Sequence, residues 1–167
     1  MGEAKQTKAQ TITAVCEKNW DAKSGDCSGF VKVVASDLGL SLTGQANAII
    51  KHIRSNWSKA TNGADAASKA AAGNLVIGGL EATPNGHVVV VVDGPLNREK
   101  YPTAYWGKLG GVGKKKTTIN FSWNSTDRDL VEYYYSTIGQ TVLAGANPSR
   151  VINWDLADLQ RRISSWL

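Results

Sequence analysis

The hydrophobic pattern of this chain changes once along its length, and that change limits the folds open to it. Up to about residue 72, apolar side chains recur at helical spacing, as Phe30, Val34 and Leu38 do. Beyond that point the pattern is extended, and its clearest part is the unbroken apolar run 88–92, which is typical of a buried strand. Helices followed by strands predict an α+β domain in which N-terminal helices pack on a small antiparallel sheet.

The same patterns set the expected elements. We expect helices at residues 10–21, 27–38, 44–57 and 64–72, and strands at residues 75–77, 87–92, 103–109 and 117–123. Gly39 stands where a left-handed residue would end the second helix. A further helix is expected from Asn124 to Ile138, because Asn124 can cap it and acidic residues follow in its first turn.

The last segment of the chain carries a regular apolar stripe. Its members are spaced three or four residues apart and are Ile152, Leu156, Leu159, Ile163 and Trp166. This is the spacing of an amphipathic helix. We therefore expect residues 1–143 to form one domain and residues 144–167 to form a C-terminal helix docked on it.

Length and charge exclude several classes of protein. A chain of 167 residues fits one domain, and 19 Lys and Arg against 14 Asp and Glu give a net charge of +5. A basic surface favours anionic partners. The sequence has no zinc-finger spacing, aromatic RNA-binding pattern or basic helix, so no nucleic-acid partner is expected. Glycines precede the run 114–116, but Lys115 stands where a phosphate-binding loop needs Ser or Thr, which predicts a solvated hairpin loop.

The sequence also predicts no membrane insertion. The apolar run 88–92 is far shorter than the ~20 residues that a membrane helix needs. Residues 1–10 are polar and show no Sec signal peptide. We expect a protein made in the cytoplasm that, if it acts elsewhere, leaves by a route that needs no such peptide.

Two cysteines and two histidines are the candidates for chemistry. Cys16 lies in an apolar stretch, where a thiol behaves as a small hydrophobic group. Cys27 follows a turn and begins a predicted helix. His52 is expected at the surface, whereas His87 begins the clearest strand. These four side chains do not have the spacing of a metal site, so no metal and no cofactor are expected.

Cys27 and His87 together predict a nucleophile and its base. Unpaired N–H groups at a helix start lower the pKa of a thiol and can hold an oxyanion, so Cys27 and Ser28 are expected to supply these donors. Asp26 and Gly29 flank the nucleophile, and Gly29 leaves room for a substrate. A cysteine on a helix start followed by a histidine on a strand start is the papain-like arrangement.

The sequence around Cys27 resembles a known family. Asp26-Cys27-Ser28-Gly29-Phe30-Val31 is similar to the nucleophile motif of the NlpC-type papain-like cell-wall peptidases. Other stretches resemble, in order, the first family of type VI secretion amidase effectors, which cleave peptidoglycan. These stretches are 18–21, 46–48, 86–88, 94–96, 100–102 and 123–129. The resemblance covers residues 15–138 and implies a papain-like NlpC-type fold for residues 1–143.

The resemblance implies a secreted antibacterial toxin. Such effectors hydrolyse the amide between γ-D-glutamate and meso-diaminopimelate in the peptide stem of Gram-negative peptidoglycan, with Cys27 as nucleophile and His87 as base and acid here. It also implies secretion by the type VI machinery, action in the periplasm of a target cell, and a cognate periplasmic immunity protein as partner. A disulfide between Cys16 and Cys27 would block the nucleophile and is not expected.

Two questions stay open from the sequence. The group that orients His87 is expected on the strand after it, yet residues 103–107 offer no Asn, Asp or His, and Trp106 stands where the related effectors have a cysteine. A backbone carbonyl is one substitute, and Asp93 is the nearest acid. The activity also has alternatives: an amidase that cuts the cross-link between diaminopimelate and D-alanine, or a catalytically idle wall-binding module.

Overall fold

A six-stranded antiparallel sheet forms the centre of the protein in the computed structural model, which describes residues 6–139. The strand order is β1-β6-β2-β3-β4-β5. The strands are β1 Ser58–Ala60, β2 Leu75–Leu80, β3 His87–Val91, β4 Thr103–Trp106, β5 Lys114–Thr118 and β6 Glu132–Ser136. The α-helices are α1 Lys8–Lys23, α2 Cys27–Asp37, α3 Ala46–Asn56 and α4 Gly63–Ala71. The predicted α+β class, with helices before the sheet, is confirmed.

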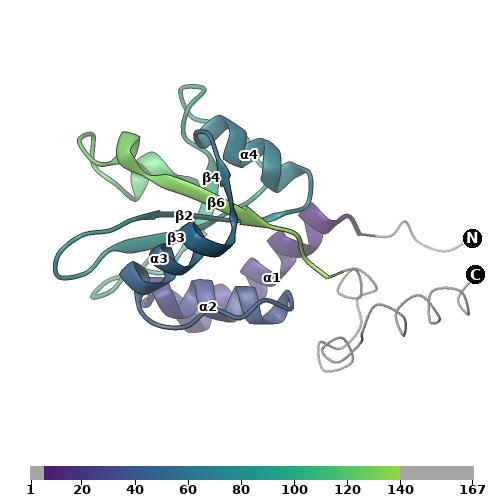
Figure 1. The fold of residues 1–167 in the computed structure, drawn as a ribbon, viewed down its shortest axis with the longest axis horizontal. Helices are drawn as coiled ribbons and strands as arrows, with labels where there is room; N and C mark the ends of the chain where they lie inside the picture. The colour runs from purple at the N-terminus through teal and green to yellow at the C-terminus, as the bar shows by residue number, and fades with distance from the viewer. Residues whose placement is uncertain (1–5, 140–167) are drawn as a thin grey trace, which may run out of the picture.

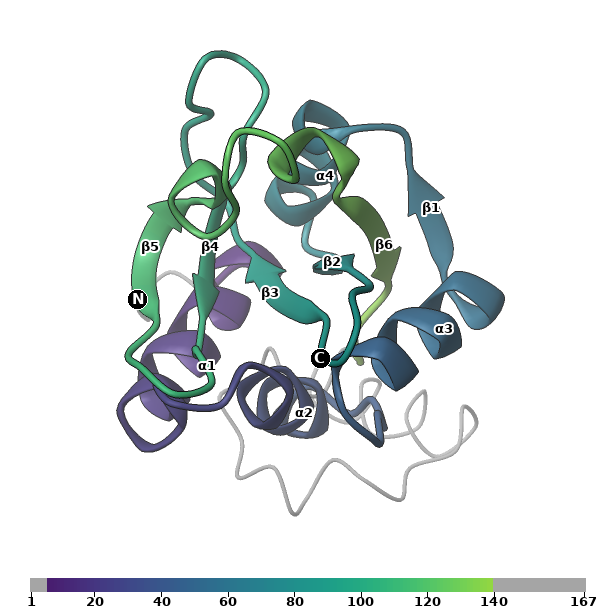
Figure 2. The same cartoon turned by 90° about the vertical axis from the view of Figure 1, so that its left-hand side faces the viewer.

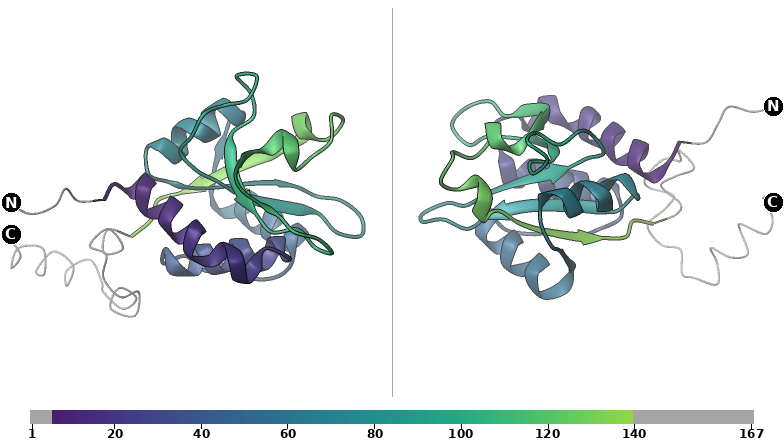
Figure 3. Two further views of the ribbon diagram at one scale, coloured as in Figure 1. Left: turned by 180° about the vertical axis from the view of Figure 1, so that it is seen from behind. Right: turned by 90° about the horizontal axis from the view of Figure 1, so that it is seen from above.

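The helices form two unequal layers on the sheet. The helices α1, α2 and α3 lie on one face, and α4 lies on the other (Figures 1 and 2). The view from above in Figure 3 shows α4 lying over the sheet, where it contacts β2 and β6. No helix of the described residues is long and apolar enough to cross a membrane. The helix expected at residues 144–167 lies outside the described residues.

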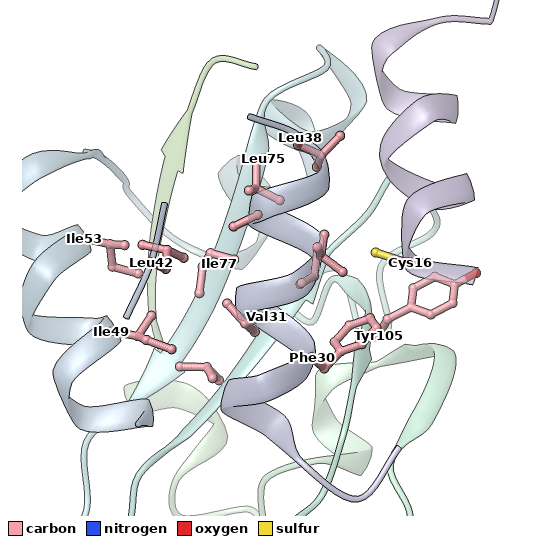
Figure 4. Close-up of a cluster of buried hydrophobic side chains, with 14 of the residues drawn as sticks. Cys16, Phe30, Val31, Leu38, Leu42, Ile49, Ile53, Leu75, Ile77 and Tyr105 are labelled. Atoms are coloured by element: carbon pink, nitrogen blue, oxygen red, sulfur yellow. The ribbon is translucent and has the colours of Figure 1, made fainter. Parts of the chain in front are cut away.

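Successive side chains of a strand point to opposite faces of the sheet, and each face has its own hydrophobic core. The larger core joins the sheet to α1, α2 and α3. Figure 4 shows Phe30 of α2 beside Tyr105, and Val31 on the side of α2 that faces Ile49 of α3. Cys16 is fully buried in this core, as its apolar neighbours predicted. The strand β3 serves both faces, since Val88 and Val90 belong to the larger core and Val89 to the smaller one under α4.

The helix α2 is bounded at both ends by local hydrogen bonds. At its end Gly39 has φ +83°, which confirms the expected left-handed cap. The N–H of Gly39 donates to Ser36 O and that of Leu40 donates to Ala35 O, the pair of bonds that defines a Schellman motif. The length and direction of α2 are therefore set by its own sequence, which matters because Cys27 is its first residue.

The prediction of a helix from Asn124 to Ile138 is wrong. Asn124 does cap, but its Oδ1 accepts from the N–H groups of Thr126 and Asp127 within a turn. A short 3-10 helix, Arg128–Leu130, follows, and then the chain becomes β6. The strand pairs with both β1 and β2, and it buries Tyr134 in the larger core and Tyr133 in the smaller one. Non-local pairing thus overrides a local helix-start signal.

Smaller differences concern the strand bounds. The short strand β1 carries little apolar pattern and was not expected. The strand β5 begins at Lys114, so part of the expected lysine loop is in the sheet, and the expected strand at 117–123 ends in a 3-10 helix, Ile119–Phe121. Residues 107–113 join β4 to β5, which confirms the hairpin interpretation.

Close packing of α3 on β2 depends on Gly79. A Cβ there would lie 2.7 Å from Ile50 Cγ1, which is closer than real contacts allow. We predict that Gly79→Ala lowers the free energy of unfolding by about 1–3 kcal/mol through overpacking. Ile50→Ala alone costs about 2–5 kcal/mol. Because the second change makes room for the first, urea unfolding of the double variant should show a loss well below the sum.

Gly78 provides the matched control for this cycle. A Cβ at Gly78 would meet Val89 and Tyr133 on the other face of the sheet. Gly78→Ala combined with Ile50→Ala should therefore give additive losses. Additive losses for the Gly79 pair as well would contradict the close contact with α3.

Candidate active site

Cys27 is the first residue of α2, and 8% of its surface is exposed. Asp26 is the N-cap, and its Oδ1 accepts the N–H of Gly29 at 2.9 Å. The N–H of Asp26 itself donates to Lys23 O at 3.1 Å. Two of the four N–H groups that a helix start leaves unpaired are thereby used, and those of Cys27 and Ser28 remain beside the sulfur.

Gly29 is needed by this cap. A Cβ at position 29 would lie 2.3 Å from Asp26 Oδ2, so a side chain there would displace the capping carboxylate. The hydroxyl of Ser28 lies 2.9 Å from Gln45 Oε1 and 3.2 Å from Asp26 Oδ1, and its single proton is shared between these two acceptors, which links α2 to the start of α3. The motif 26–29 thus builds a rigid helix start under the thiol, a role that the sequence did not reveal.

His87 is the first residue of β3 and follows the β2–β3 hairpin, residues 81–86. Asn47 of α3 pins this hairpin, because its Nδ2 donates to Ala82 O at 2.9 Å and its Oδ1 accepts the Ala82 N–H at 3.2 Å. Gly86 passes so close to Asn47 that a Cβ would lie 2.3 Å from its Oδ1. The histidine is therefore held from both sides, by the sheet and by α3.

One cavity joins the predicted nucleophile and base. The start of α2 and the start of β3 lie at the same end of the molecule, which faces the viewer in Figure 2. A cavity of about 220 Å³ opens there. Its lining residues are Asp26, Cys27, Ser28, Gln45, Ala46, Asn85, Gly86, His87, Lys108 and Leu109. The structure thus brings together four of the five predicted site residues, and Gly29 is one position behind them.

The thiol is neutral in the protein without substrate. Burial raises the pKa of Cys27 above its ordinary value, and the Asp26 carboxylate adds to this. Backbone N–H groups of Val88, Ser28 and Cys27 itself act on the sulfur in the opposite direction, because they stabilise a thiolate. Burial is the largest effect. The expectation that the helix start lowers the pKa of this thiol is therefore wrong in its net direction.

The imidazole of His87 is neutral as well. Burial lowers the pKa of His87 to about 4, and the nearby cation Lys108 acts in the same direction. The ring packs edge-on against Trp123, with 4.9 Å between ring centroids. Its Nε2 lies 2.7 Å from Ser122 Oγ.

Ser122 is a site residue that sequence analysis missed. It lies inside a predicted strand and next to a recognisable motif at 123–129, but nothing in its own context marks it. Asp93, the nearest acid in sequence, lies beyond the far end of β3 and lines another hollow with residues of α1. Trp106 borders a second cavity of about 140 Å³ beside His87, together with Lys108, Val112, Lys114, Phe121 and Ser122.

The loop 107–113 forms the basic wall of the site. The N–H groups of Lys108 and Gly113 both donate to Ser24 O, at 2.9 and 2.8 Å, and so tie the loop to the turn before α2. Lys108 lines both cavities that His87 borders. Leu109 and Val112 expose most of their surface on the same loop.

The remaining candidates lie apart from this site. Cys16 and Cys27 are both free thiols, and His52 is exposed on α3. Across residues 6–139, no three His, Cys, Asp or Glu side chains are grouped as metal ligands would be.

A helix-borne thiol and a strand-borne imidazole on one cavity, in an α+β domain, have the arrangement of a papain-like hydrolase. Comparison with known proteins identifies the kind of hydrolase. The chain is 40% identical over 149 residues to the peptidoglycan amidase Tse1 of Pseudomonas aeruginosa, and the match covers 83% of this chain and 97% of the relative. No family model matches. The chain belongs to the family of this amidase, as its motifs predicted.

The neutral state of the thiol has a direct consequence for alkylation. Only the thiolate reacts with iodoacetamide, so a raised pKa predicts that Cys27 labels more slowly at pH 7 than an unfolded thiol. The rate should rise about tenfold per pH unit into the alkaline range. Mass spectrometry of timed samples between pH 5 and pH 10 measures it.

Cys27→Ala gives the background in this assay, and the fully buried Cys16 should contribute none while the protein is folded. A rate at pH 5–6 equal to that at pH 9 would contradict a neutral resting thiol and would indicate a thiolate–imidazolium pair.

Proposed function

We propose that the protein hydrolyses an amide in the peptide stem of Gram-negative peptidoglycan by a Cys27–His87 mechanism. The observation that carries the proposal is the single cavity onto which both side chains open, in a chain homologous to a peptidoglycan amidase over most of its length.

The residues of the cavity supply each step of an acyl transfer. The thiol proton passes to His87 as the sulfur attacks the amide carbon. The oxyanion accepts hydrogen bonds from the N–H groups of Cys27 and Ser28, the two that the Asp26 cap leaves free. The imidazolium then gives its proton to the leaving amine as the C–N bond breaks. Water attacks the thioester carbon and gives a proton to His87, the C–S bond breaks to release the carboxylic acid, and the imidazolium returns its proton to the sulfur.

We propose the γ-D-glutamyl–meso-diaminopimelate amide as the bond that is cut. The resemblance to the first family of type VI amidase effectors supports this choice. On the same basis the protein is secreted by the type VI machinery without a Sec signal, acts in the periplasm of a target cell, and is neutralised by a cognate periplasmic immunity protein. Asp26 and Gly29 support the hydrolysis indirectly. The Asp26 carboxylate caps α2, and the absence of a side chain at Gly29 leaves room for that carboxylate.

The catalytic assignment predicts that Cys27→Ala and His87→Ala each abolish digestion of isolated sacculi. Either change removes a group that no neighbour replaces in the steps above, so the loss should reach at least about 10³-fold. Chromatography and mass spectrometry of the released fragments measure the rate and identify the new termini. The same variants should fail to lyse Gram-negative cells when directed to the periplasm.

Cys16→Ala and His52→Ala are the matched controls, since the same residue types lie there outside the cavity. Both should digest sacculi as the parent does. Wild-type digestion by Cys27→Ala would refute the mechanism. Binding of sacculi without new fragments would identify a wall-binding module, and fragments cut between diaminopimelate and D-alanine would identify the cross-link as the target.

Lys108 predicts how the site recognises its substrate. Peptide stems carry free carboxylates, and Lys108 is a cation on the rim of both cavities. Lys108→Met should raise KM about two- to fivefold, as expected for a solvent-exposed ion pair, and salt should shrink the difference. The acid limb of kcat/KM should also move to higher pH, because Lys108 lowers the pKa of His87. Lys59→Met, on β1, should change neither value.

A further inference from the structure

We propose that Ser122 is the positioning residue that orients the imidazole of His87, in the place where papain-like enzymes use a residue of the following strand. This inference rests on the proposed Cys27–His87 mechanism. Its direct evidence is the 2.7 Å contact between Ser122 Oγ and His87 Nε2. The contact joins residues 35 positions apart and lies within the half-buried part of the site.

The contact decides which ring nitrogen serves as the base. Ser122 occupies Nε2, so Nδ1 is the nitrogen left to take the proton from Cys27. A neutral ring whose Nδ1 is free to accept must carry its proton on Nε2, where it donates to Ser122 Oγ. When Nδ1 gains the thiol proton, the Nε2–H bond persists and strengthens, because its donor is now charged. Ser122 therefore fixes both the ring and its tautomer.

Ser122 is held firmly enough for this task. It follows the 3-10 helix Ile119–Phe121, and its N–H donates to Ile119 O at 2.9 Å. Ile119 is fully buried, and its own N–H donates to Pro102 O, just before β4. On the other side Trp123 is buried and packs against the imidazole itself. The turn that carries the hydroxyl is thus anchored in the smaller core at both flanks.

The residues expected in this role do not fill it. Trp106 occupies the strand position, but an indole has only an N–H donor and offers no acceptor to a protonated Nε2. The main-chain carbonyl of Trp106 accepts from Trp20 Nε1 at 3.0 Å. Asp93 lies past the far end of β3. The hydroxyl of Ser122 is the group that the described fold places against the ring.

A hydroxyl and a carboxylate in this place have different electrostatic effects. A carboxylate would stabilise the imidazolium and raise the pKa of His87, whereas a neutral hydroxyl orients the ring without adding charge. This difference separates positioning from a merely structural role, because exchange of the hydroxyl for a carboxylate must move the pH profile.

Three variants of position 122 test the proposal on the full chain. Ser122→Ala should lower kcat on sacculi by about 10- to 100-fold with KM little changed, a part of the ~10²–10⁴-fold that a positioned acid–base contributes. Ser122→Thr, which keeps the hydroxyl, should restore most of the rate. Ser122→Asp should move the acid limb of kcat/KM toward neutral pH. Ser136→Ala removes a hydroxyl of similar exposure on β6 and should leave the rate unchanged.

A spectroscopic measurement keeps the test independent of turnover. The chain has two histidines, so His52→Gln leaves His87 as the single imidazole for ¹⁵N NMR. The shifts should report the Nε2–H tautomer with Ser122 present, and a mixture of tautomers in Ser122→Ala. An unchanged rate and tautomer in Ser122→Ala would overturn the role of Ser122 while leaving the mechanism intact. Full activity of Cys27→Ala would instead overturn the mechanism.

Discussion

The packing of the start of α2 against the start of β3 is the interaction on which the site depends. It sets the Cys27 sulfur against the main chain of β3, where the Val88 N–H acts on it. The interface is made by core side chains, with Phe30 and Val88 fully buried. The Asp26 cap and the Gly39 turn fix where α2 begins and ends, so a one-residue shift of the helix is not accommodated. The relative placement of thiol and imidazole is therefore a property of the core rather than of a flexible loop.

The same burial fixes the resting charge of the site. Removing a thiol and an imidazole from water disfavours the charged form of each, so the pKa of Cys27 rises while that of His87 falls to about 4. A preformed thiolate–imidazolium pair is then disfavoured. On the proposed mechanism the ions appear only during reaction, when the N–H groups of Cys27 and Ser28 already point at the developing oxyanion and Ser122 Oγ already accepts from the imidazole. Preorganised hydrogen-bond partners of this kind lower a barrier without having to reorient.

Much of this architecture could be predicted from local sequence, and the failures share a cause. Helical spacing, the turn before Cys27 and a cap at Gly39 are local signals, and they placed α2 and Cys27 well. His87 was found because an unbroken β-branched run is itself local. The segment that becomes β6 has a genuine capping signal at Asn124, yet its structure is decided by two partner strands remote in sequence. Ser122 was missed for the same reason, since its proposed role depends on a contact with His87, which is 35 positions away in the sequence.

The structure also explains why the stretches outside the nucleophile motif resemble the effector family. Asn47 pins the hairpin that carries His87, and Trp20 donates to the strand that ends at Trp106. Tyr101 donates to Asp129 at 2.7 Å, which joins two of the matched stretches across the smaller core. These contacts hold the scaffold around the site. Resemblance spread over such residues reports the fold, and the chemistry has to be argued from the cavity.

The basic rim and the neutral orienting group belong to one electrostatic arrangement. Lys108 disfavours the imidazolium before substrate binds, and Ser122 contributes no charge to oppose it. On the proposed function, a stem carboxylate that pairs with Lys108 cancels much of this effect and lets the pKa of His87 rise. The base then becomes stronger when the correct substrate is in place. A carboxylate at position 122 would provide that stabilisation permanently, and the resting site would lose its dependence on the charge of the substrate.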